Sequence, residues 1–126
     1  EEFLEEAFAH VKEVWGLEQC RMGIGSYISV EKAEKGEFQE YDGLFTPAFR
    51  AVFKEKIMIK PKGTYLCAYL KGSWSYLPKL YEKMFTYAKK ENLRLTGFAY
   101  EWGMNDFSVS REEDYITQIM IKAEQL

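Results

Sequence analysis

One carboxylate stands in the middle of an apolar and aromatic stretch, "GFAYEWGMND", at residues 97–106. The composition is typical of a β-strand, whose successive side chains point to opposite faces of a sheet. Alternation predicts that Glu101 shares one face with Ala99 and Gly103, whereas the large aromatic residues lie on the other face and pack against helices. A carboxylate in a roomy, partly dry groove either pairs with a cation or has its pKa raised. We therefore expect a ligand site at Glu101; the alternative is an exposed glutamate near a strand end.

Five aromatic residues are further candidates for the same site: Tyr27, Phe45, Trp74, Tyr76 and Tyr115. An aromatic ring offers its face to a cation, and tyrosine adds a hydroxyl that donates or accepts a hydrogen bond. Trp74 and Tyr76 lie where a strand is expected to give way to a helix, at the mouth of a groove. The alternative for Trp74 is a lid over the core, and for Tyr27, Phe45 and Tyr115 it is ordinary core packing.

Two helices and five strands are expected to position these residues. Apolar side chains at helical spacing predict amphipathic helices over residues 3–15 and 77–91. Runs rich in Tyr, Phe, Ile and Thr predict strands within residues 20–30, 41–53, 63–72, 93–102 and 114–123. The charged runs at 30–40 and 110–114 are expected to be solvated loops.

The two halves of the chain show an internal repeat with an offset of 74 residues, which relates Gly23 to Gly97 and Tyr41 to Tyr115. The same offset relates Tyr27 to Glu101, so both are expected to face one groove. The predicted fold is α+β: two pseudo-symmetric strand-helix-strand-strand repeats, residues 1–53 and 61–126, form one domain. Its antiparallel sheet carries helices on one face and a ligand groove between the repeats. The counterpart of the strand near 63–71 falls before Glu1, so the first strand is expected to be missing.

Composition narrows the possible functions. The 126 residues are 47% hydrophobic, which suits one globular domain. The net charge of −3 and the lack of a Lys/Arg cluster argue against direct nucleic-acid binding. A single histidine and two distant cysteines disfavour a zinc site or a histidine-based triad, and we expect no metal or cofactor. No apolar run reaches membrane-spanning length and no signal peptide opens the chain, which indicates a cytoplasmic protein without a membrane partner.

The sequence resembles the GyrI-like effector-binding domain over nearly its whole length. The resemblance rests on "EKGEFQEYDGLF", on "PKGTYLCAYLKGSWSYLPKLYEKMFTYAKKENL", and most specifically on "GFAYEWGMNDFSVSREEDYITQIMI". Such domains occur at the C-terminus of many bacterial MerR-type and AraC-type transcription regulators and as stand-alone proteins. The resemblance implies that Glu101 lies in a central groove that binds small organic ligands, often cationic drugs. Trp74 and Trp102 stand where smaller or other aromatic residues are common, so the sequence leaves the ligand's identity open.

Three functions follow from these observations. The first is a ligand sensor of a transcription regulator, which would contact DNA only through an upstream domain that this chain lacks. The second is a hydrolase of strained electrophilic compounds with Glu101 as general base, although no nucleophile–base pair is visible. The third is a stand-alone protein that sequesters drugs or inhibits another protein. An open sheet edge would also allow a homodimer by strand pairing.

Overall fold

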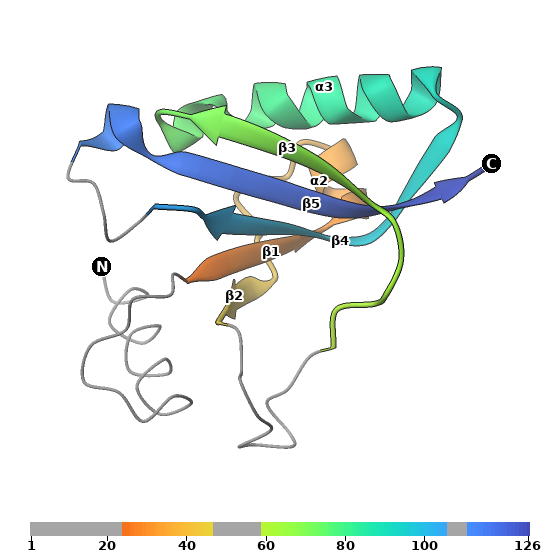
Figure 1. The fold of residues 1–126 in the computed structure, drawn as a ribbon, viewed down its shortest axis with the longest axis horizontal. Helices are drawn as coiled ribbons and strands as arrows, with labels where there is room; N and C mark the ends of the chain where they lie inside the picture. Colours follow the sequence, from red (N-terminus) through yellow and green to blue (C-terminus); the bar gives the residue numbers. More distant parts are fainter. Residues whose placement is uncertain (1–23, 47–58, 106–110) are drawn as a thin grey trace.

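The computed structural model describes residues 24–46, 59–105 and 111–126. The helix predicted over 3–15, His10, Cys20 and the part of the predicted 41–53 strand beyond residue 46 lie outside the described residues. The described chain has an α+β fold in which five antiparallel strands form one open sheet in the order β2-β1-β4-β5-β3 (Figure 1). The bounds of the strands are Gly25–Ser29 for β1, Gly43–Phe45 for β2, Tyr65–Lys71 for β3, Leu93–Gly103 for β4 and Ile116–Gln125 for β5.

The main helix, α3 (Leu77–Lys90), confirms the helix that its apolar spacing predicts. Its buried residues recur every three or four positions and form one stripe: Leu77, Tyr81, Met84 and Ala88. Pro78 lies in the first turn, where its missing N–H costs nothing. Asn92, just past the end, has a φ of 56°, a left-handed conformation that stops the helix. A short 3-10 helix, η1 (Trp74–Tyr76), leads into α3, and a second, η2 (Glu112–Asp114), precedes β5.

The helices pack on the sheet face that carries Ala99 and Glu101, which is the reverse of the expectation from the sequence. Figure 1 shows α3 lying along one face of the sheet. On that face the side chains of Ile28, Ala99, Ile119 and Ile121 are fully buried against the helix stripe. Ala99 is small enough for the helix and its large side chains to approach closely. The helix therefore needs the face with the smaller residues, and the aromatic face of β4 points away from it.

The aromatic residues on the other face of the sheet pack largely against one another. The rings of Tyr27 and Phe98 meet edge to face with centroids 5.3 Å apart, and Phe45 stacks on Trp102 at 5.7 Å. Tyr100, opposite Tyr27 in the sheet, is 4% exposed. Such geometries are the favourable ones for aromatic pairs, so this face has its own layer of apolar contacts.

Residues 30–34, expected to be part of a solvated loop, form a short helix, α2 (Val30–Glu34). The Ser29 hydroxyl accepts a hydrogen bond from the Lys32 amide at 3.2 Å and caps the helix N-terminus. Val30 and Ala33 are buried in the same core as the stripe of α3. Two apolar positions three residues apart are enough for one turn against a core, and the charged residues between them hide that pattern in the sequence.

Asp42 holds the segment between α2 and β2 in place. One of its carboxylate oxygens accepts from the Ser29 amide at 2.8 Å, and the other accepts from the Lys32 ammonium at 2.9 Å. The Asp42 amide donates to the Tyr27 carbonyl at 3.0 Å. These contacts tie the β2 end of the segment that carries Phe38 and Tyr41 to β1 and to the start of α2. In the described residues no helix is long and apolar enough to cross a membrane.

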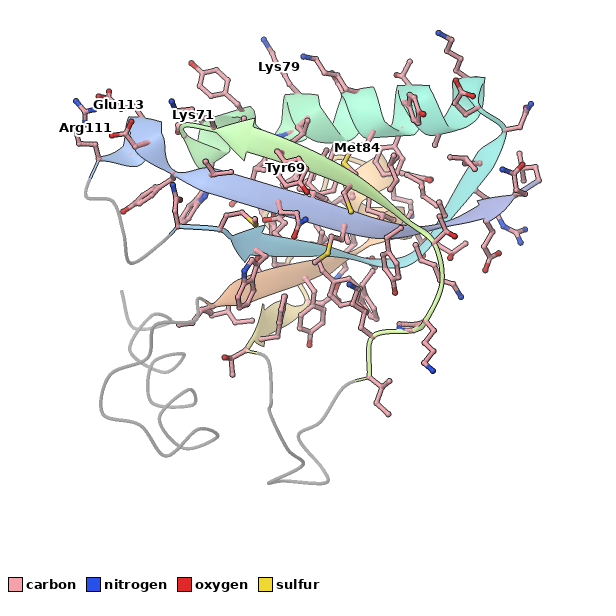
Figure 2. The ribbon with its side chains drawn as sticks, in the orientation of Figure 1. Tyr69, Lys71, Lys79, Met84, Arg111 and Glu113 are labelled. Atoms are coloured by element: carbon pink, nitrogen blue, oxygen red, sulfur yellow. The ribbon has the colours of Figure 1, made fainter. Side chains whose placement is uncertain are left out.

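Core packing under α3 predicts unequal costs for two alanine substitutions in this helix. Figure 2 shows Met84 directed from α3 toward the sheet and Lys79 directed away from it. Met84 is 3% exposed, so Met84→Ala should lower the free energy of unfolding by about 2–5 kcal/mol, because it leaves a cavity. Lys79→Ala, on the exposed side, should change it by less than about 0.5 kcal/mol. Urea unfolding measures both, and equal costs would contradict this packing.

Candidate functional site

A cavity of about 690 Å³ opens on the helix side of the sheet, between the segment before β2 and the start of α3. Ser26 and Glu101, neighbours on β1 and β4, form part of its lining from the sheet. One wall comes from the segment between α2 and β2 and includes Phe38 and Tyr41. The opposite wall comes from η1, the first turn of α3 and the start of β5, and includes Trp74, Pro78 and Tyr115.

Glu101 is a buried carboxylate, 6% exposed, that accepts three hydrogen bonds from hydroxyl groups. Its Oε2 atom accepts from the Tyr41 hydroxyl at 2.5 Å and from the Tyr81 hydroxyl at 2.6 Å. Its Oε1 atom accepts a longer bond from the Ser26 hydroxyl at 3.2 Å. The carboxylate is therefore not the unpaired group that its sequence context suggests, because neutral donors compensate part of its burial.

Three separate parts of the fold bring these hydroxyls together. Ser26 lies directly opposite Glu101 in the pairing of β1 with β4. Tyr81 belongs to the buried stripe of α3, which directs its hydroxyl at the sheet. Tyr41 lies just before β2 and next to Asp42, which is itself tied to the start of α2. The network therefore depends on the sheet, the helix and the segment before β2 being assembled at the same time.

Burial dominates the electrostatics of the network. It raises the pKa of Glu101, and the three hydroxyl donors only partly oppose this effect. Burial, together with the neighbouring carboxylate, raises the pKa of both Tyr41 and Tyr81 well above the ordinary tyrosine value. Both phenols are therefore protonated at neutral pH and act as donors toward Glu101.

Trp74 and Tyr115 form a stacked aromatic pair at the cavity. Their ring centroids are 6.2 Å apart and their planes differ by 19°. The Trp74 indole N–H donates to the hydroxyl of buried Thr117 at 3.0 Å, and the Gly72 amide donates to the Tyr115 carbonyl at 2.8 Å. Since the one donor of the indole is already used, Trp74 offers the cavity an apolar ring and no free polar group. The ring remains 58% exposed, so a ligand can reach it.

Comparison with known families agrees with this architecture. The family profile described as "GyrI-like small molecule binding domain" matches residues 22–124. The chain belongs to the GyrI-like family. No curated protein and no solved structure matched the chain in the corresponding searches. A small-molecule binding role is thus supported by the family and is consistent with a cavity of this size.

The GyrI-like domain brings three of the six sequence-predicted residues together. Glu101, Trp74 and Tyr115 all line the cavity. Tyr76 is 57% exposed and is not among the described residues that line it.

Two of the predicted residues lie on the wrong face of the sheet. Tyr27 pairs with Tyr100, and Phe45 stacks on Trp102, all on the face away from α3. The expectation that Tyr27 faces the same groove as Glu101 was therefore wrong. Cross-strand neighbours share a face, so Ser26, and not Tyr27, lies beside the carboxylate.

Sequence reasoning missed Ser26, Tyr41 and Tyr81 as residues of the site. Tyr41 and Tyr115 each follow an acidic residue just before a strand, and both line the cavity, so this shared local pattern was the available signal. Tyr81 lies in an apolar helix stripe, where a phenol brings into the core a hydroxyl that needs an acceptor. Ser26 had no local signal, because its role depends on strand register.

Within the described ranges, no group of three or more His, Cys, Asp or Glu side chains could hold a metal ion.

The raised pKa of Glu101 predicts how the stability of this GyrI-like domain depends on pH. A carboxyl group with a raised folded pKa stabilises the fold most below its ordinary value of 4.5, and that contribution is lost as pH rises through the folded pKa. Glu101→Gln cannot titrate. The melting temperature of the wild type, measured relative to that of Glu101→Gln, should therefore fall between pH 4 and neutral pH (about 7). A difference that stays constant or increases over this range would mean that the pKa is not raised.

Proposed function

We propose that this GyrI-like domain binds flat, lipophilic organic cations in the cavity beside Glu101, as the ligand sensor of a bacterial transcription regulator. The observation that carries the proposal is a buried carboxylate at a cavity, whose donors in the described part of the chain are all neutral hydroxyls. No lysine or arginine among the described residues forms an ion pair with Glu101. A cationic ligand would supply the positive charge that the described residues do not place beside Glu101.

Size and composition of the cavity support this ligand class. A volume of about 690 Å³ falls in the range of sites for drug-sized molecules. Phe38 and Tyr41 on one wall and the Trp74–Tyr115 pair on the other contribute aromatic rings to the lining of the cavity. Aromatic faces attract cations and stack on flat ligands without strict demands on shape. In this proposal the carboxylate selects positively charged ligands, and the aromatic walls select flat ones.

The two walls also suggest how binding could reach another part of a regulator. They come from different elements, the segment before β2 and the start of α3, so a ligand between them favours the arrangement in which both contact it. A ligand shifts such an equilibrium only by its difference in affinity for the two arrangements. DNA contact would then belong to a separate DNA-binding part of the regulator, in the cytoplasm.

A homodimer through strand pairing stays a prediction.

Strand pairing supports a pseudo-two-fold arrangement of repeats, with an offset that differs from the expected one. Glu101 lies 75 positions after Ser26, its direct partner. Gly25 pairs with Phe45 between β1 and β2, and Tyr100 pairs with Met120 between β4 and β5. Adding 75 to the residue numbers of the first pair gives the second pair, so the same offset relates both strand pairings. We therefore propose that the axis passes between Ser26 and Glu101, so that the ligand site lies at the centre of the repeat pair.

The substitution Glu101→Gln tests the proposed function. It keeps the shape of the side chain and removes its charge, so affinity for a planar cationic dye should fall about ten- to hundred-fold, as expected for loss of a charge-assisted contact. A neutral isostere of the dye should lose far less. Calorimetric titration of both compounds into wild type and variant measures the difference.

Tyr27→Phe is the matched control, because it removes a hydroxyl on the opposite face of the sheet and should leave both affinities unchanged. Equal losses for dye and isostere in Glu101→Gln would mean that Glu101 shapes the cavity without recognising charge. No loss for either compound would remove Glu101 from the site.

Mass analysis of each mixture separates sensor from hydrolase: an unchanged compound agrees with the proposal, and a converted one favours the enzyme.

A further inference from the structure

The hydrogen bonds of Glu101 leave a single acceptor position for a ligand. A carboxylate offers about four lone-pair positions, two on each oxygen. The hydroxyls of Tyr41 and Tyr81 use both positions of Oε2, and the hydroxyl of Ser26 uses one of Oε1. Building on the proposed function, we infer that Tyr41 restricts the site to cations with one N–H donor, such as tertiary ammonium groups, and disfavours amidinium and guanidinium groups.

We place the free position on the cavity side of the carboxylate, because Glu101 itself lines the cavity. Oε1 is bonded to Ser26, which lines the cavity, whereas Tyr81, bonded to Oε2, is not among the described lining residues. Tyr81 is 1% exposed, and its ring packs against those of Phe38 and Phe85 with centroids 5.1 Å and 6.3 Å apart. Close packing prevents this phenol from turning away, so its hydroxyl keeps one side of Oε2 permanently occupied.

Tyr41 occupies the position that a two-donor cation would need. Amidinium and guanidinium groups bind carboxylates best with two parallel N–H bonds, one to each oxygen. Here the second N–H would point at Oε2, where the Tyr41 hydroxyl already donates from the cavity lining. That N–H would stay buried without an acceptor, which costs affinity. A tertiary ammonium has one N–H and meets Oε1 alone, so it loses nothing.

The test uses two compounds with the same planar arene, one carrying a dimethylaminomethyl group and the other an amidine. For wild type, the dimethylammonium compound should bind about ten-fold more tightly than the amidinium compound, as expected for one unsatisfied buried donor. Tyr41→Phe frees the cavity-side position of Oε2 and should shift this ratio about ten-fold toward the amidinium compound. Tyr81→Phe frees a position that faces the core, so it should change both affinities alike and preserve the ratio.

The outcomes separate the inference from the proposed function. A wild-type ratio near one, or in favour of the amidinium compound, overturns the inference, and this measurement does not depend on any variant folding. A ratio that Tyr41→Phe leaves unchanged, or that Tyr81→Phe shifts equally, removes Tyr41 as the residue that sets specificity. If Glu101→Gln still weakens both compounds in these cases, the proposed function stands. If Glu101→Gln weakens neither compound, the proposed function fails and the inference fails with it.

Discussion

The hydrogen bonding of one buried carboxylate is the constraint on which the described fold depends. Glu101 is 6% exposed, and hydroxyls from three distant segments donate to it and partly oppose the rise in its pKa that burial causes. A buried carboxylate that loses its donors is costly, so the register of β1 with β4, the orientation of α3 and the position of the segment before β2 are coupled through a single side chain. Non-directional apolar packing would tolerate small shifts of each element, but three hydrogen bonds to two oxygens do not.

This coupling also explains why the cavity lies on the helix side of the sheet. Ser26 donates to Glu101 from the neighbouring strand, and the other two donors come from elements that cover its face of the sheet; α3 supplies one of them, Tyr81, from the core. Ala99, next along the same face, lets the helix approach closely, whereas the aromatic face of β4 would hold it away. The helix covers Ala99 and begins just after η1, which carries Trp74, so the sheet beyond the start of the helix stays open between two aromatic walls.

The sequence predicts the five strands and α3 of the described chain, because their signals are local. Apolar spacing locates α3 nearly to the residue, and alternation in β4 separates the side chains of the two faces. Alternation cannot decide which face meets the helix, since both faces of β4 carry apolar side chains and the alternation is the same for either choice. Within the site, Glu101 and Trp74 stand out by residue type, but Ser26 and Tyr81 acquire their roles only through strand register and helix orientation. The sequence did not predict the short helix α2, because one capping serine and two buried positions make a weak pattern.

The misplaced Tyr27 shows why residue identity is a poor guide to register in a repeat. Rotation about a two-fold axis perpendicular to a sheet does not exchange the two faces of the sheet. Two residues that such an axis relates must therefore lie on the same face. Tyr27 and Glu101, separated by 74 positions, do not, whereas Ser26 and Glu101, separated by 75, do. Because side chains alternate with a period of two, an error of one residue moves every counterpart to the opposite face. If the proposed axis holds, the repeat pairs a serine with a glutamate at its centre, and the asymmetry of that pair gives the cavity one charged group instead of two.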